Sequence, residues 1–228
     1  MQPLDLKIAA ILKFSTLDYP GKLSAVVFTQ GCPIRCVYCH NPDFQDYKKP
    51  QTIEFDEFLS FLKTRKNLLD AVVFSGGEPL MQSGLYDAVS IVKQEGFLVG
   101  LHTAGTIPDR FEQVLPILDW VGFDIKTYFD KYEEITKVPN SGELALKSFD
   151  LLQKSGVSFE IRTTVDSRNI TSEDLINIAR FLKLKLIKKW VLQECIIRST
   201  DKDLKIPLPS PDVLDSISKY IDIEIRRQ

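Results

Sequence analysis

Three of the four cysteines in this chain of 228 residues lie close together. Cys32, Cys36 and Cys39 follow the spacing C-x3-C-x2-C. Thiolates this close in sequence can converge on one metal centre, and a [4Fe–4S] cube normally takes four cysteines. A cube held by only three cysteines keeps one iron open to a small molecule, which suits chemistry better than electron relay. The spacing therefore predicts an iron–sulfur site with one exchangeable iron.

A zinc site is the competing interpretation of the same cysteines. His40 or the distant Cys195 would then supply the fourth ligand. Structural zinc sites usually pair two C-x2-C knuckles, and this chain has only one. Cys39 and His40 are adjacent, so it would be awkward for both side chains to point into one tetrahedron. The pattern favours the iron–sulfur site, and we expect Cys195 to be a buried, apolar-like thiol.

Composition is that of an ordinary globular protein, with 44% hydrophobic residues, 26% charged residues and a net charge of −2. Four lysines between 183 and 189 alternate with Leu and Ile, so they indicate a solvated rim and predict no nucleic-acid binding. No segment reaches the roughly 20 apolar residues of a membrane helix, and residues 1–14 do not read as a secretory signal. Clustered cysteines without an export signal favour metal binding in a reducing cytoplasm.

Apolar, β-branched runs alternate with amphipathic stretches, which is typical of βαβ units. We expect strands at 24–29, 70–75, 97–103, 120–126, 157–165 and 189–194, with a short closing strand at 221–226. We expect helices at 54–65, 85–95, 108–118, 143–154, 172–182 and 211–220. Six strand–helix pairs fall short of the eight in a closed barrel. The sequence therefore predicts an α/β fold, a partial (β/α)6 TIM-like barrel.

A length of 228 residues allows a single domain. Within it we expect an N-terminal extension at 1–23 that covers the bottom or edge of the barrel. The barrel core would span 24–194, and 195–228 would hold the C-terminal helix and the possible closing strand.

Polar motifs follow the predicted strands at the ends where barrel active sites form. The cysteine loop follows the first strand, and Gly76-Gly77-Glu78-Pro79 follows the second. Glycine allows unusual torsions and proline starts a helix, so this segment could be an ordinary strand-to-helix turn. Alternatively, the free backbone carbonyls at the strand end could bind an ammonium group. Asp124 and Lys126 end the fourth strand on one face, either as a plain ion pair or as part of a site.

The fifth strand carries a further charged pair. Glu160, Arg162 and Thr164 face the same way because alternate strand residues point together. Charges that face into a barrel are costly unless they are paired or bound to a ligand. We therefore expect Arg162 to contact a ligand or to order Asp124, with a structural salt bridge as the alternative.

These motifs together resemble the radical S-adenosylmethionine (SAM) superfamily, specifically its glycyl-radical-enzyme activases. The resemblance rests on the cysteine loop, the aromatic Tyr38 before its last cysteine, the His40-Asn41-Pro42 continuation and the Gly-Gly-Glu-Pro turn. It implies a barrel of the radical SAM type, with a [4Fe–4S] cluster and SAM as cofactors and no catalytic side chain beyond them. It assigns the cluster to Cys32, Cys36 and Cys39, and SAM to Tyr38, Gly76, Gly77, Glu78, Pro79, Asp124, Lys126 and Arg162.

The turn Asp18-Tyr19-Pro20-Gly21, with Gln30-Gly31-Cys32-Pro33 and Cys39-His40-Asn41-Pro42, is most similar to activating proteins of anaerobic ribonucleoside-triphosphate reductase. Pro-Gly alone also makes a plain turn. The resemblance implies reductive cleavage of SAM to a 5′-deoxyadenosyl radical, which generates a glycyl radical on a partner enzyme. Because the chain has no further cysteine knuckles for auxiliary clusters, we expect an outside electron donor such as flavodoxin or ferredoxin.

Two other functions stay open on the sequence alone. One is a radical SAM enzyme acting on a small molecule, as a 7-carboxy-7-deazaguanine synthase does, and the other is a non-catalytic metal-binding module. Some activases bind a monovalent cation through an Asp where this chain has His102. Whether a cation binds near His102 and Asp124 also stays open, and His102 could equally be a structural histidine.

Overall fold

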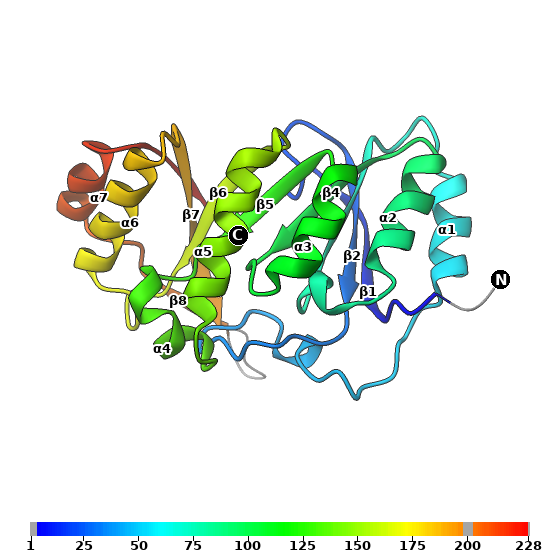
Figure 1. The fold of residues 1–228 in the computed structure, drawn as a ribbon, viewed down its shortest axis with the longest axis horizontal. Helices are drawn as coiled ribbons and strands as arrows, with labels where there is room; N and C mark the ends of the chain where they lie inside the picture. Colours follow the sequence, from blue (N-terminus) through cyan, green and yellow to red (C-terminus); the bar gives the residue numbers. More distant parts are fainter. Residues whose placement is uncertain (1–3, 198–202, 228) are drawn as a thin grey trace.

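A computed structural model describes residues 4–197 and 203–227 of the chain (Figure 1). One nine-stranded sheet runs in the order β1-β2-β3-β4-β5-β6-β7-β8, and β9 also pairs with β7. The strands are β1 (Ile8–Ser15), β2 (Ser24–Thr29), β3 (Ala71–Gly76), β4 (Leu98–Thr103), β5 (Trp120–Asp124), β6 (Ser158–Val165), β7 (Lys189–Ile197), β8 (Leu204–Ile206) and β9 (Asp222–Arg226). Strands β2 to β7 are parallel, β1 and β8 run antiparallel to their neighbours, and β9 is parallel to β7.

The barrel is open because, within residues 4–197 and 203–227, β1 pairs with neither β8 nor β9. The helices are α1 (Phe55–Lys63), α2 (Leu85–Gln94), α3 (Pro108–Val114), α4 (Tyr132–Thr136), α5 (Ser141–Ser155), α6 (Ser172–Leu184) and α7 (Pro211–Ser218). Figure 1 shows α1, α2, α3 and α5 side by side on the outer face of the sheet, with α6 and α7 near β7. The predicted partial α/β barrel is confirmed.

Some elements differ from the expectation, each for a local reason. The helix expected to reach residue 118 ends at Val114, and a 3-10 turn follows, because Pro116 cannot donate the helical hydrogen bond. The helix α4 and the strand β8 are too short to produce a readable periodicity. The expected extension forms the edge strand β1, and β7 continues to Ile197, which places the buried Cys195 within that strand.

The concave side of the barrel holds its own small apolar cluster. Tyr19 packs there with Val26, Val73 and Trp120, and the rings of Tyr19 and Trp120 lie 5.1 Å apart. Tyr19, from the turn that begins at Asp18, therefore packs into the barrel interior. Most of the remaining core lies between the sheet and the outer helices.

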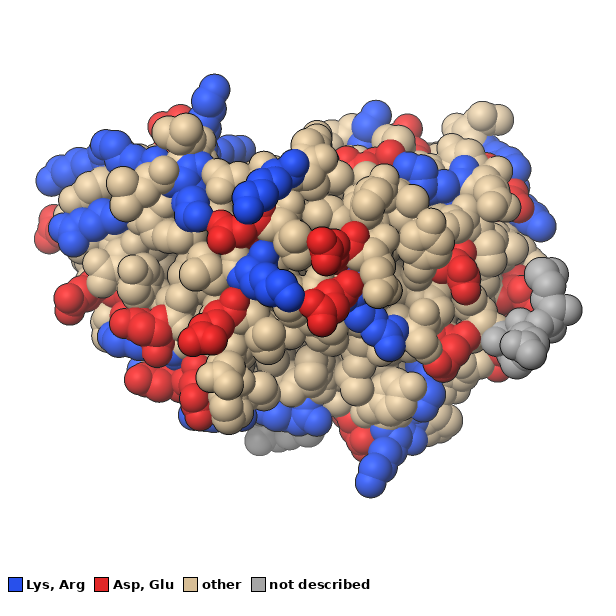
Figure 2. Space-filling model, viewed as in Figure 1, with Lys and Arg blue, Asp and Glu red and all other residues tan. Residues whose placement is uncertain are grey.

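The surface in Figure 2 intersperses Lys and Arg with Asp and Glu. Among residues 4–197 and 203–227, no helix has the length and apolarity that crossing a membrane requires.

Candidate active site

The carboxyl ends of the parallel strands surround a cavity of about 590 Å³. This volume is in the range of small-molecule and cofactor sites. Its lining includes these residues that the sequence analysis assigned to the site: Cys32, Cys36, Tyr38, Cys39, Gly76, Gly77, Glu78, Asp124, Lys126 and Arg162. Pro79 is outside the lining, buried at the start of a 3-10 turn that it shapes. The fold thus brings residues from four separate strand ends into one cavity.

The cysteine loop is held in place by backbone hydrogen bonds to α4. The amide of Arg35 donates to the carbonyl of Thr136 at 2.7 Å, and the amide of Val37 donates to that of Ile135 at 3.2 Å. Helix carbonyls at a C-terminus have no partner within their own helix, so the loop satisfies them. A short helix that the sequence did not reveal therefore sets the position of the cysteines.

The thiols of the loop sit in an environment that disfavours a free thiolate. Burial raises the pKa of Cys32 to about 12, with a further contribution from Glu78. Burial also raises the pKa of Cys36, against the opposing effect of Lys126. A bound metal must displace these protons, since the ligand form of cysteine is the thiolate.

The donor set suits an iron–sulfur cluster better than a single ion. Across the described ranges 4–197 and 203–227, no three His, Cys, Asp or Glu side chains converge closely enough to hold one metal ion. A tetrahedral zinc site needs such convergence, whereas a four-iron cube bonds each thiolate through a different iron. Cys195 is not among the residues that line the cavity, so the described lining offers three thiols, all from one loop.

The Gly76–Gly77 turn packs directly against the start of the cysteine loop. Gly76 has a φ of +117°, which glycine adopts readily. The amide of Gly77 donates to the carbonyl of Thr29 at 2.9 Å, and the amide of Glu78 donates to that of Gly31 at 2.9 Å. A Cβ added to Gly77 would overlap the backbone carbonyl of Gly31. Only glycine allows this close approach of the two segments.

Glu78 uses its side chain to join two strand ends. Its carboxylate accepts hydrogen bonds from the Thr103 hydroxyl at 2.7 Å, the Ala104 amide at 2.9 Å and the Leu80 amide at 3.2 Å. Only 2% of the residue is exposed, and burial raises its pKa even though these hydrogen bonds oppose the shift. The side chain expected to contact the cofactor is thus occupied with holding the end of β3 against the end of β4.

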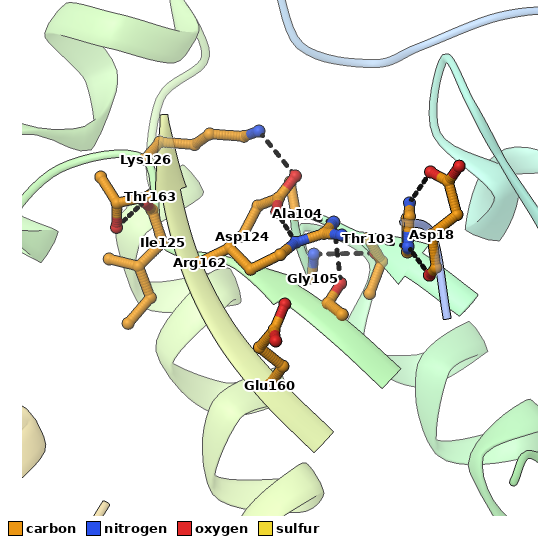
Figure 3. Close-up of polar contacts among 12 residues, drawn as sticks. Asp18, Thr103, Ala104, Gly105, Asp124, Ile125, Lys126, Glu160, Arg162 and Thr163 are labelled. Atoms are coloured by element: carbon orange, nitrogen blue, oxygen red, sulfur yellow. Dashed lines mark hydrogen bonds and ion pairs between the residues drawn. The ribbon is translucent and has the colours of Figure 1, made fainter. Parts of the chain in front are cut away.

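Asp124 lies between two cations, as Figure 3 shows. The Arg162 Nε donates to Oδ1 of Asp124 at 2.9 Å, and the Lys126 Nζ donates to Oδ2 at 3.2 Å. Burial by itself raises the pKa of Asp124, but Arg162 and Lys126 outweigh it and hold that pKa at about 2. We call Asp124, Arg162 and Lys126 the Asp124 trio. Near neutral pH its members together bring a net charge of +1 to the cavity. The contact of Arg162 with Asp124 fits both the expected ordering of Asp124 and the alternative of a structural salt bridge.

His102 is a neutral, hydrogen-bonded histidine. Its Nε2 lies 2.8 Å from the carbonyl oxygen of Asp18 and 3.0 Å from Nη1 of Arg162. One nitrogen cannot both donate to the carbonyl and accept from the guanidinium, so its tautomer decides between the two. Burial, reinforced by Arg162, lowers the pKa of His102 to about 4 against the raising effect of Asp18 and Asp124. His102 therefore connects the Asp18 turn to the Asp124 trio.

Tyr38 joins the cysteine loop to the end of β5. Its hydroxyl donates to the carbonyl of Lys126 at 3.1 Å, and its ring is buried at the cavity wall. The amide of Lys126 in turn donates to the hydroxyl of Tyr132 at 3.0 Å. Two tyrosines thus position the backbone that carries the lysine.

Sequence reasoning missed the cavity residues that come from the two ends of the sheet. Leu12 and Leu17 contribute from β1 and the loop after it, and Arg226 from β9. Nη1 and Nη2 of Arg226 donate to the two carboxylate oxygens of Glu160 at 2.8 and 3.0 Å, although 66 positions separate the two residues in the sequence. The alternation of Glu224 and Arg226 in the closing strand was the available signal that charged side chains there face inward.

Comparisons with known proteins agree with this architecture. The model of the radical SAM superfamily matches residues 26–182. A protein named as a glycyl-radical enzyme activating enzyme from Methanocaldococcus jannaschii is 34% identical, with 94% of this chain and 93% of that protein covered. The pyruvate formate-lyase-activating enzyme of Clostridium pasteurianum is 32% identical over 78% of this chain and 76% of its own.

A solved structure shows the same fold. SuiB of Streptococcus suis bound to S-adenosylmethionine superposes with a TM-score of 0.66 at 13% identity, covering 87% of this chain and 48% of that one. Radical SAM proteins use a [4Fe–4S] cluster and SAM, and glycyl-radical-enzyme activases act on a glycyl radical enzyme. The extent of the family match and the similarity along nearly the whole chain show that this protein belongs to the radical SAM superfamily, among the activating enzymes of glycyl-radical enzymes.

Proposed function

We propose that Cys32, Cys36 and Cys39 bind three irons of a [4Fe–4S] cluster and that the adjoining cavity holds SAM. One observation carries this proposal: three thiols of one loop line the same cavity as the Gly76–Gly77 turn and the Asp124 trio. When bound there, the cluster would supply the one electron that cleavage of SAM to methionine and a 5′-deoxyadenosyl radical requires.

The cationic trio is suited to the carboxylate of SAM. Asp124 forms an ion pair with both cations, so neither lacks a partner, and the remaining net charge of +1 attracts an anion. Lys126 lines the same cavity as the cysteine loop. Burial lowers its pKa, but attraction to Asp124 and to Cys36 outweighs that effect and raises the pKa, so the ammonium group is available to bind a carboxylate. Arg162 supports the trio from β6.

The remaining assigned residues shape the binding surface. The carbonyls of the Gly76–Gly77 turn accept hydrogen bonds from the amino group of SAM. Glu78 and Pro79 hold that turn in position through their buried contacts. The face of Tyr38 packs near the adenine, because flat aromatic faces suit flat rings. None of these roles requires a general acid or base, which agrees with a chain that has two histidines.

We propose anaerobic ribonucleoside-triphosphate reductase as the partner on which the glycyl radical forms, with flavodoxin or ferredoxin as electron donor. The Asp18-Tyr19-Pro20-Gly21 turn and the Cys39-His40-Asn41-Pro42 continuation support this choice. A relative named for pyruvate formate-lyase makes that enzyme the competing partner.

The first experiment measures 5′-deoxyadenosine after anaerobic reconstitution with iron, sulfide, SAM and dithionite. We expect product from the wild type and from Cys195→Ala, whose thiol is outside the cavity, and none from Cys36→Ala. Absence of product from a wild type that holds a complete cluster and binds SAM contradicts the proposed chemistry.

The second experiment identifies the partner. Purified anaerobic ribonucleoside-triphosphate reductase and pyruvate formate-lyase are each incubated with the reconstituted enzyme, and the glycyl radical is recorded by electron paramagnetic resonance. We expect a signal on the reductase. A signal only on pyruvate formate-lyase would replace the proposed partner, and a small molecule that stimulates turnover without either protein would favour the metabolite-directed alternative.

A further inference from the structure

Three large apolar side chains are exposed within six residues at one edge of the open barrel. Leu12 is 45% exposed, Phe14 56% and Leu17 64%. We call these three residues the β1 patch. Apolar groups gathered in this way on a surface mark interaction sites more often than singly scattered ones do.

The strand that carries the patch has an uncovered edge. β1 pairs with β2 on one side, and on its other side Ile8 forms a single bridge to Ile53. Beyond Ile8, the described residues provide no strand partner for that edge. An exposed edge with apolar side chains promotes unwanted pairing unless something covers it. Lys13 is the only charge within β1, and it extends toward the ring of Phe61.

The patch is continuous with the active-site cavity. Leu12 and Leu17 line the cavity beside Asp18, and Arg226 of β9 lines it from the opposite end of the sheet. Those two sheet ends do not pair within the described ranges, so the backbone leaves a seam between them, with cavity-lining residues on both of its sides. A chain segment that enters through this seam must pass over the β1 patch.

We propose that the β1 patch is the docking surface for the glycine-bearing segment of the partner enzyme. This inference rests on the proposed function, since it takes the glycyl radical enzyme as the occupant. Glycine itself has no side chain, so side-chain contacts must come from the residues that flank it in the partner, and an apolar surface favours apolar ones. Those residues pack on Leu12, Phe14 and Leu17 while the glycine reaches into the cavity.

An exposed leucine outside the cavity supplies the matched control. Leu184 is 82% exposed at the C-terminal end of α6, which precedes the amino end of β7. The amino ends of the parallel strands lie opposite the cavity, so Leu184 cannot contact a segment that enters it. Leu184→Ser removes more exposed apolar surface than Leu17→Ser does, because Leu17 is 64% exposed, but it does so at the end of the barrel away from the cavity.

The test measures equilibrium binding of full-length anaerobic ribonucleoside-triphosphate reductase and of pyruvate formate-lyase to the reconstituted enzyme, together with partner-free 5′-deoxyadenosine formation. We expect Leu17→Ser and Phe14→Ser to weaken binding of the accepted partner about tenfold, equivalent to about 1.4 kcal/mol. Phe14 is outside the cavity lining, so partner-free cleavage of SAM by Phe14→Ser stays within about twofold of the wild type, and Leu184→Ser changes neither quantity.

Unchanged partner affinity in both patch variants overturns the inference, as does the absence of any complex between the wild type and either enzyme. Sedimentation velocity tests whether a second copy of this chain occupies the patch instead. If the variants abolish self-association but bind the partner normally, the patch is a contact between copies of this chain. Binding is measured without turnover, so loss of SAM cleavage in the wild type contradicts the proposed function separately.

Discussion

At the scale of single residues, Asp124 balances the positive charges at the centre of the site. It is the carboxylate that compensates both Arg162 and Lys126, and Arg162 is only 5% exposed. Removing one member of a buried ion pair leaves an uncompensated charge, which typically costs about 3–5 kcal/mol. Asp124 is therefore a structural residue as well as a candidate SAM-binding one.

We predict that Asp124→Asn lowers the free energy of unfolding by about 3 kcal/mol and weakens SAM binding. Chemical denaturation and a SAM titration measure the two effects. Asp109→Asn is the control, because Asp109 forms an ion pair with Lys147 while its side chain is 82% exposed, and such pairs contribute at most about 1 kcal/mol. Equal destabilisation by both substitutions would show that Asp124 contributes no more to stability than a carboxylate in an exposed ion pair.

His102 makes stability depend on pH in a defined window. Its pKa falls from 6.5 in the unfolded chain to about 4 in the folded one. Between these values the unfolded histidine holds a proton that the folded one lacks, so unfolding takes up a proton and stability decreases as pH falls. The pKa of Glu78 is raised on folding, so protonation of Glu78 increases stability as pH falls. The pKa of Asp124 is lowered from 3.8 to about 2, so its protonation decreases stability only below about pH 3.8.

We predict that the stability difference between wild type and His102→Gln shrinks as pH falls from 6.5 toward 4. The comparison cancels the contribution of Glu78, which both proteins contain. Urea unfolding at several pH values supplies the measurement. A difference that stays constant across this window would mean that His102 is not held neutral by burial, Arg162 and its neighbours.

At the scale of elements, the close contact between the Gly76–Gly77 turn and the cysteine loop aligns the two halves of the site. The turn ends β3, and the loop follows β2, which is its immediate parallel neighbour. Any side chain at residue 77 would push apart backbone segments that have no freedom to yield, since the nearest atoms belong to Gly31 and Phe44 main chain.

We predict that Gly77→Ala reduces the iron bound after reconstitution by more than half, because displacement of Gly31 moves the adjoining Cys32. Iron content and visible absorbance report the loss. Gly96→Ala is the control: Gly96 has a φ of +93° but no atom within 4 Å of an added Cβ, so it tests backbone strain without collision. If both variants bind iron like the wild type, the turn does not position the loop.

At the scale of the whole molecule, we propose that residues 1–228 form one domain. The nine-stranded sheet is continuous, and its main core cluster includes residues from Leu6 near the start to Ile221 near the end. Strand β9 is tied back to β6 through Arg226 and Glu160, so the C-terminal part is attached to the barrel core.

We therefore predict one cooperative thermal transition for the metal-free, reduced protein. Far-ultraviolet circular dichroism reports the sheet and helices, and fluorescence reports Trp120 in the barrel interior and Trp190 in the main core. Coincident transitions indicate a single cooperative unit. Two separated transitions would divide the chain, with the C-terminal segment the first candidate for independent melting.

What could be predicted from the sequence by itself follows from short-range physics. The C-x3-C-x2-C spacing and the strand-by-strand alternation are local, so the cysteine loop, the six parallel strands and the inward face shared by Arg162 and Thr164 were all readable. In a parallel sheet, strand ends gather at one rim, which is why Cys32 and Asp124 could be expected in one site although they are far apart in the chain.

Only the tertiary structure decided which side chains from distant segments meet. The pairing of Arg226 with Glu160, the contact of His102 with Asp18 and the pinning of the cysteine loop by α4 all depend on sheet curvature and on loops without periodicity. The exposure of Leu17 likewise depends on where the barrel stays open. A local pattern specifies how an element forms, but burial and long-range contacts arise only when the elements pack together.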